Sequence, residues 1–168
     1  MHVLPEVPEW FPVRLCGLAA GGVGAFRCAE EETIYREDVE ARARRYELQA
    51  TRWPDPFPSD TEWALLAATY AKQIGRGVAF SLAAFRQAFA AGRDLGVRDN
   101  VLIAAAACEM HPVALIKGAE LGSTKRRLDE ATAAADAAGV LDVPAIVTPR
   151  GDVFHGDRAL EKAAGATA

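Results

Sequence analysis

A proline stands at the head of the most strand-like segment of the chain, and this position limits the folds open to the sequence. The segment reads LDVPAIVTPRGDVFHGDRALEKA, in which Pro144 precedes the run Ala145 to Thr148. Proline lacks an N–H and has a fixed φ, so within a sheet it is confined to a first residue, an edge or a bulge. A type I turn at Pro149 to Asp152 then predicts a hairpin whose second strand is Val153 to His155.

Helices are predicted between this hairpin and a first strand near the N-terminus. The apolar run Trp10 to Leu18 indicates a buried strand, with its strand core at Val13 to Leu18. Apolar spacing and helix-breaking residues then predict five or six helices, over residues 34–49, from 59, around 82–89, and over 98–110, 112–121 and 124–139. A last helix follows Gly156 and Asp157. The order strand, helices, hairpin, helix indicates an α/β protein with helices inserted between parts of one small sheet.

One helix start carries a specific signal. Ser59 and Glu62 are spaced as in a capping box, which predicts a helix that begins at Ser59. Helical spacing places Trp63, Leu66, Tyr70 and Ile74 on one face, and we expect that face to point into the core.

Composition and charge exclude several classes of function. The net charge of −4 gives no electrostatic reason to bind nucleic acid. The first thirty residues lack a basic start and no run is long enough to span a bilayer, so we expect no membrane segment. Three cysteines, Cys16, Cys28 and Cys108, are odd in number and form no C-x-x-C, which favours a reducing compartment and a cytoplasmic protein.

Familiar catalytic and metal-binding signatures are absent from the sequence. It contains no G-x-S-x-G, H-E-x-x-H, P-loop or C-x-x-C motif. The cysteines and histidines match no zinc spacing, so we expect no metal. Reactive thiolates are favoured at helix N-termini, and the predicted helices place no cysteine there.

Three stretches of the chain agree, in order, with one known group of proteins. They are Trp10 to Val13, the proline-rich loop Pro54 to Pro58 with Thr61, and Gly139 to Arg158. In these stretches the chain resembles the DsbA-like branch of the thioredoxin fold, and within it the 2-hydroxychromene-2-carboxylate isomerases and kappa-class glutathione transferases. The fold class that this implies is α/β, a thioredoxin-like (DsbA-like) fold with a large helical insertion.

The resemblance also implies a ligand site. In this fold the proline that heads the hairpin follows a cis peptide bond and leaves the preceding residue free to receive a thiol substrate or glutathione. By resemblance, Val143, Pro144, Gly156 and Asp157 are the ligand-binding residues, and glutathione is the candidate cofactor. The family's first strand and its active-site Ser or C-x-x-C have no counterpart here, so no catalytic residue is assigned.

Two functions follow from these observations. One is a thiol- or glutathione-dependent oxidoreductase or isomerase, and the other is a non-catalytic binding or assembly module, or a truncated form of such an enzyme. We expect residues 1–28 and 140–168 to form the thioredoxin-like part and residues 29–139 the helical insertion. The partners expected are a small thiol or glutathione conjugate and either a second copy or a partner that donates a strand, because a sheet without its first strand has unpaired backbone groups.

Overall fold

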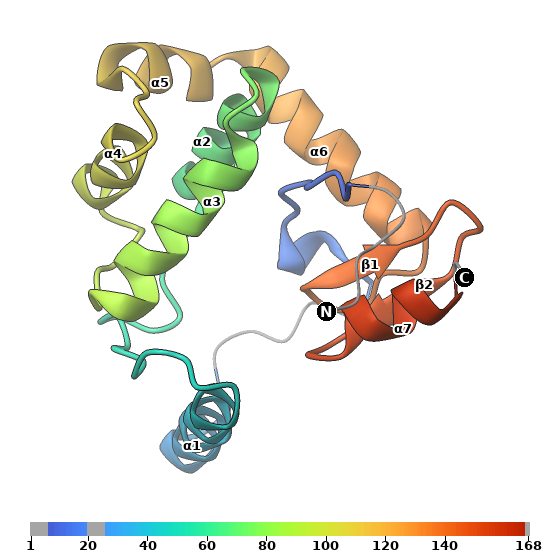
Figure 1. Ribbon diagram of the computed structural model, residues 1–168. Coiled ribbons are helices and arrows are strands. Elements are labelled where there is room, and N and C mark those ends of the chain that lie inside the picture. The colour runs from blue at the N-terminus through green and yellow to red at the C-terminus, as the bar shows by residue number, and fades with distance from the viewer. Residues whose placement is uncertain (1–6, 20–25, 167–168) are drawn as a thin grey trace. The chain divides into compact units, whose positions relative to one another are not determined.

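The structure, a computed structural model, describes residues 7–19 and 26–166 (Figure 1). It divides into two compact units. Residues 1–23 and 126–168 form the unit that we call the hairpin unit, and residues 24–125 form the helical unit. The glycine-rich stretch 20–25 lies outside the described residues.

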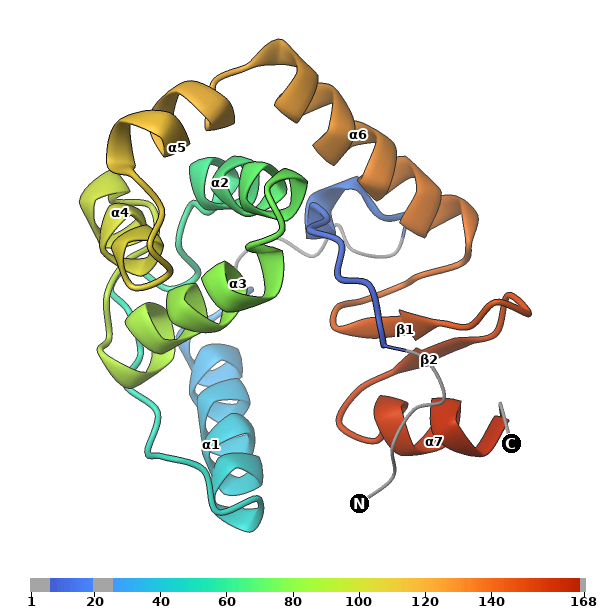
Figure 2. The same ribbon diagram turned by 45° about the horizontal axis from the view of Figure 1, so that its top comes forward.

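In the helical unit, three helices, α3, α4 and α5, pack against α2. Figures 1 and 2 show α2 and α3 side by side, and α2 also packs against α4 and α5. The elements are α1 (Ala29–Arg45), α2 (Glu62–Gln73), α3 (Gly77–Phe85), the π-helix η2 (Arg86–Ala90), α4 (Arg98–Ala106) and α5 (Pro112–Ala119).

Alanine forms most of the core of the helical unit. The buried face of α2 is made of Ala64, Ala67, Ala68 and Ala71, and these pack with Phe80 and Leu115. The predicted inward face is therefore wrong in part, because Ile74 is 47% exposed, whereas Trp63 and Tyr70 pack at the edge of the core. Small side chains let helix backbones approach closely, so the alanine face is the one that can be buried here.

The contact between α2 and α5 depends on one glycine. A Cβ placed on Gly118 would lie 2.2 Å from Cε2 of Tyr70, far inside van der Waals contact. Gly118 itself is buried on α5. The tyrosine ring therefore lies directly on the backbone of α5, and only glycine leaves room for it.

We predict that Gly118→Ala destabilises the protein by at least ~2 kcal/mol, because overpacking a core of this density forces the ring or the helix to move. Chemical denaturation measures the change in the free energy of unfolding, provided that the dependence of this free energy on denaturant concentration is the same for both proteins. Gly165→Ala in the helix α7 (Ala159–Ala166) is the matched control, because nothing lies within 4 Å of its added Cβ. Equal free energies of unfolding for the Gly118→Ala variant and the native chain would contradict this packing.

The start of α2 differs from the predicted capping box. The helix begins at Glu62, and the Oδ1 atom of Asp60 accepts the Glu62 N–H at 3.1 Å. The Ser59 hydroxyl instead donates to the Pro56 carbonyl at 3.1 Å. Asp60 thus satisfies a free N–H of the first turn in place of Ser59.

The predicted first strand at Trp10 to Leu18 is not formed. Residues 7–14 have no regular structure, and Leu15–Gly17 is the 3-10 helix η1. One N–H group of this segment and one just after it bond to side chains of α6 (Gly122–Ala137). Arg14 N–H donates to Oγ1 of Thr132 at 3.1 Å, and Ala19 N–H donates to Oδ1 of Asp136 at 2.7 Å.

The side chain of Arg14 adds to the same attachment. Its guanidinium contacts Oδ1 of Asp129 at 2.5 Å. Asp129, Thr132 and Asp136 are spaced three and four residues apart, so they lie along one face of α6. Side chains on this face of α6 accept hydrogen bonds that a neighbouring strand would otherwise accept. Leu18, which follows η1, is buried.

The predicted hairpin is present after α6. Gly139 has a φ of +84°, and Val140 N–H bonds back to the Ala135 carbonyl at 3.0 Å, which ends the helix in a Schellman-type turn. The strands β1 (Ala145–Val147) and β2 (Val153–His155) pair antiparallel, and α7 (Ala159–Ala166) packs against both. Figures 1 and 2 show the hairpin beside α7.

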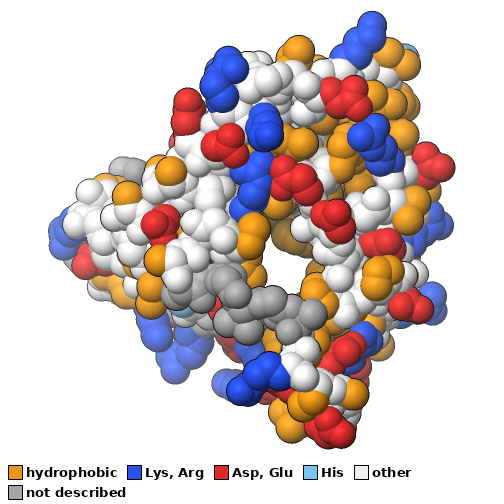
Figure 3. All heavy atoms as spheres, turned by 180° about the vertical axis from the view of Figure 1, so that it is seen from behind, with side chains coloured by type: hydrophobic (Ala, Val, Ile, Leu, Met, Phe, Trp, Pro, Cys, Tyr) orange, Lys and Arg blue, Asp and Glu red, His pale blue; other side chains and the backbone are white. Residues whose placement is uncertain are grey.

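Charges of both signs are distributed over the surface. Figure 3 shows Lys and Arg side chains intermixed with Asp and Glu on the face that it displays. Among residues 7–19 and 26–166, no helix is both long and apolar enough to cross a bilayer.

Candidate ligand site at the open end of the hairpin

The hairpin register brings together the four residues assigned to the ligand site. Ala145 pairs with His155, so Val143 and Pro144, just before β1, lie at the same end of the hairpin as Gly156 and Asp157, just after β2. All four residues are exposed. The Val143–Pro144 peptide bond is cis, the geometry that the resemblance implies. The four residues form what we call the hairpin-end patch.

The hydrogen-bond pattern shows which backbone groups of β1 point away from β2. The Thr148 N–H donates to the Asp152 carbonyl at 2.9 Å, so these two residues form a hydrogen-bonded pair. In an antiparallel ladder such pairs alternate, which makes Ile146 and Phe154 the next one. The N–H and C=O groups of Ala145 and Val147 therefore point to the other edge of β1.

That outer edge has no strand partner in the part of the chain that the structure describes. The sheet there has two strands, β1 and β2. Val147 and Val143, which follow this edge, are 45% and 41% exposed. The edge is therefore a row of available backbone donors and acceptors that leads to the hairpin-end patch.

Two side chains fix the segment that enters β1. The Nε2 atom of His155 accepts the Leu141 N–H at 3.1 Å, so its imidazole acts as an acceptor that holds this segment against the end of β2. The Oδ1 atom of Asp142 accepts the Val143 N–H at 2.7 Å. A carboxylate thus already occupies the position from which a ligand would accept a hydrogen bond from Val143.

Sequence reasoning missed the role of Asp142. The sequence shows only that an aspartate precedes Val143, and an aspartate in such a position is ordinarily a solvated surface residue. The role of His155 as an acceptor for the Leu141 N–H was likewise not predicted, because the sequence places this residue only at the end of a strand.

One cysteine lies at a helix start, contrary to the sequence-based expectation. The helix α1 begins at Ala29, five residues before the predicted start, and Cys28 is its exposed N-cap residue. The Glu30 N–H and the Cys28 thiol both donate to the Glu30 carboxylate, which holds the pKa of Glu30 below its usual value. Three glutamates in the first turn, Glu30, Glu31 and Glu32, already balance the positive end of the helix.

The other cysteines and the metal-ligating side chains form no further site. Cys16 is exposed, and Cys108 is buried in the core of the helical unit, where burial raises the pKa of its thiol. Among the described residues, no three His, Cys, Asp or Glu side chains are grouped as a metal site would require.

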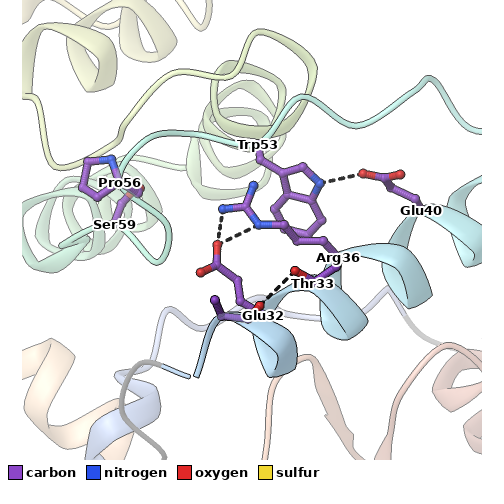
Figure 4. Close-up of polar contacts among 8 residues, drawn as sticks. Glu32, Thr33, Arg36, Glu40, Trp53, Pro56 and Ser59 are labelled. Carbon is purple, nitrogen blue, oxygen red and sulfur yellow. Dashed lines mark hydrogen bonds and ion pairs between the residues drawn. The ribbon is translucent and has the colours of Figure 1, made fainter. Parts of the chain in front are cut away.

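The proline-rich loop at residues 54–58 is held by a cluster of rings in the helical unit. Figure 4 shows Trp53 with its Nε1 directed at Glu40 of α1, to which it donates at 2.9 Å. The guanidinium of Arg36 lies 4.9 Å from the centre of the Trp53 ring and is bound by Glu32. Phe57 contacts Trp53 edge-on at 4.7 Å between ring centres. These contacts attach the loop to α1, so we assign them a structural role.

A pair of tryptophans tests this assignment. We predict that Trp53→Phe costs ~1 kcal/mol or more beyond the cost of Trp63→Phe, because Trp53 loses a hydrogen bond to a carboxylate. The buried Nε1 of Trp63 has no partner in the described structure, so its removal relieves an unmet donor. Both changes remove the same atoms. The two variants can be compared by their denaturant midpoints if their unfolding free energies depend equally on denaturant concentration. A larger loss for Trp63→Phe would contradict the hydrogen-bond assignment.

The fold is the DsbA-like thioredoxin fold, and it matches a solved structure. The chain is similar to 2-hydroxychromene-2-carboxylate isomerase with a TM-score of 0.77, at 17% sequence identity, over 95% of this chain and 80% of the isomerase chain. No family model and no curated protein sequence matches the chain. The resemblance stated from the sequence is thus confirmed at the level of the fold.

Proposed function

We propose that the protein binds a small thiol ligand, with reduced glutathione as its representative, on the hairpin-end patch. In this proposal the protein belongs to the class of thiol- or glutathione-dependent oxidoreductases and isomerases. The observation that carries the proposal is the register of the hairpin, which puts Val143 and Pro144 beside Gly156 and Asp157 at an exposed end of the sheet. The shared fold with an isomerase supports the class and not a particular substrate.

The chemistry of the patch suits a peptide-like ligand. Glutathione carries peptide N–H and C=O groups, and an exposed strand edge binds such groups through its own backbone. The ligand would compete with Asp142 for the Val143 N–H. Because Asp142 and Asp157 are both acidic, an anionic ligand would also be repelled, so the affinity should be weak.

A non-catalytic binding module is the second candidate function. The described ionisable groups around the patch include the carboxylates of Asp142 and Asp157, the guanidinium of Arg158, which pairs with Glu161, and the imidazole of His155, whose Nε2 accepts a backbone N–H. None of these groups is an activated nucleophile, and the given sequence contains no C-x-x-C motif. Binding without covalent chemistry fits these residues.

We also propose a reducing, cytoplasmic location. Its support is that all three cysteines are free thiols and that Cys16 and Cys28 are exposed. Exposed thiols of this kind persist in the compartments where glutathione keeps them reduced.

Two substitutions of opposite effect test the ligand site. We predict that Asp142→Ala tightens the binding of reduced glutathione about fivefold, because it frees the Val143 N–H and removes a repelling charge. Val143→Asp should weaken binding by a similar factor. Chemical-shift titration of the amide resonances with glutathione measures both changes and shows which residues respond.

Matched controls separate a local effect from a change in net charge. Glu130→Ala removes one exposed negative charge elsewhere on the hairpin unit, and Val113→Asp adds one at a 52% exposed valine of α5. We expect neither control to change the affinity by more than about twofold. If glutathione leaves the amide resonances of residues 141–157 unchanged, the proposed site is wrong. It is also wrong if the variants and their controls change the affinity equally.

A further inference from the structure

The imidazole of His155 joins two parts of the hairpin unit that are 14 residues apart in the chain, since its Nε2 atom accepts the Leu141 N–H at 3.1 Å. A ring nitrogen that accepts a hydrogen bond carries no proton, so the imidazole is neutral and its proton is on Nδ1. Protonation turns both ring nitrogens into donors, and Nε2 then has a hydrogen where the Leu141 N–H points. The bond therefore exists only in the neutral form of His155.

The segment that this bond holds is otherwise weakly fixed. Residues 141–144 are all exposed, and they connect the buried Val140 to β1. Among the hydrogen bonds described for these four residues, the bond to His155 reaches another element, whereas the bond between Asp142 and Val143 lies within the segment. The Leu141 side chain is 55% exposed, so burial does not replace the bond. Without the imidazole acceptor, the segment is held mainly by its two ends.

The charge of the imidazole is the one that ordinarily changes near neutral pH, because histidine titrates between about pH 5 and pH 8. Carboxylates, guanidinium groups and lysine ammonium groups ordinarily keep their charges over this range. Strand β1 carries no ionisable side chain, and α7 packs against both strands. The charged residues on the elements next to His155 are Asp142 in the held segment, Asp157 and Arg158 after β2, and Glu161 and Lys162 at the start of α7.

We propose that His155 is a pH-dependent latch for residues 141–144. The neutral imidazole holds the segment against the end of β2, and protonation releases it, so the segment is ordered at the upper end of the histidine range and loosened at the lower end. Val143 and Pro144 belong both to this segment and to the hairpin-end patch, so the same proton controls the order of the patch. The latch concerns the protein alone and does not depend on the binding of a thiol ligand.

Amide hydrogen exchange of the full chain at about pH 5 and about pH 8 measures the state of the latch. The protection of the Leu141 N–H is the ratio of its intrinsic exchange rate to its measured rate, which corrects for the effect of pH on exchange itself. We expect this protection to be about fivefold higher at the higher pH, because the acceptor is lost at the lower pH. The protection of Ile146, which lies within the ladder, should stay unchanged.

The native chain also allows a direct comparison of two titrations. The ¹⁵N resonances of the imidazole follow the protonation of His155, and the amide resonance of Leu141 follows the bond. We expect both to change with one common midpoint.

Three variants assign the response to this residue. His155→Gln keeps an acceptor, because the amide oxygen of glutamine reaches the place of Nε2, but it does not titrate, so the pH response of Leu141 should vanish. His155→Leu removes the acceptor, and Leu141 should be unprotected at both pH values. His111→Gln changes the exposed N-cap residue of α5 in the helical unit, and as the matched control it should leave the response of Leu141 as in the native chain.

A response of Leu141 that is present in the native chain, lost in His155→Gln and kept in His111→Gln supports the latch. Equal protection of Leu141 at both pH values in the native chain overturns it. A response that persists in His155→Gln, or one that disappears in His111→Gln, places the titrating group elsewhere and also overturns it. The native titrations and the two glutamine variants decide the proposal even if His155→Leu does not fold.

Discussion

The hydrogen-bond ladder between β1 and β2 is the constraint on which the functional interpretation depends. In an antiparallel pair, the backbone N–H and C=O groups of successive residues point alternately to the two edges of a strand. The bond between the Thr148 N–H and the Asp152 carbonyl therefore determines to which edge the backbone groups of each residue of β1 point. Ile146 is paired to Phe154, and Ala145 and Val147 are left for another partner. The same register brings the two ends of the hairpin together as an exposed patch.

The turns and helix ends hold this ladder in place. Thr148 accepts the Asp152 N–H with its hydroxyl at 3.1 Å and the Gly151 N–H with its carbonyl at 2.9 Å, and Gly151 has a φ of +89°, which favours glycine. At the other end, His155 holds Leu141 through its imidazole. The hairpin is short, so these side-chain bonds and the packing of α7 supply stability that three residue pairs alone would not.

The sequence predicted the hairpin well because its signals are local. Pro144, the Pro149 to Asp152 turn and Gly139 each restrict the backbone where they stand, and the structure has the strands and the helix end at these places. The proline at position 112 likewise begins α5 as expected. The resemblance extended this local reading to the fold as a whole.

The first strand was mispredicted because a strand exists only with a partner. Trp10 to Leu18 has the apolar composition of a buried strand, but Thr132 of α6 accepts the Arg14 N–H within it, and Asp136 accepts the Ala19 N–H just after it. Sequence pattern alone does not show which element provides the acceptors. The start of α1 was missed for a related reason, because its first turn consists of glutamates that complement the helix dipole and carry no apolar period.

The roles of Asp142 and His155 depend on contacts across the hairpin, and so they became visible only once the register was known. The buried face of α2 was hidden in the sequence by its own composition. Alanine contributes little to a hydrophobic pattern, and the larger Trp63 and Tyr70 dominate it although they lie at the edge of the core.

Amide hydrogen exchange of the hairpin in dilute solution tests the central claim most directly, because it reports the partner of each N–H group separately. The ladder predicts slow exchange for Ile146 and Phe154, and fast exchange for Ala145 and Val147, whose N–H groups face the open edge. Protection of Ala145 and Val147 equal to that of Ile146 in dilute protein would mean that the edge is already covered, and it would contradict the account.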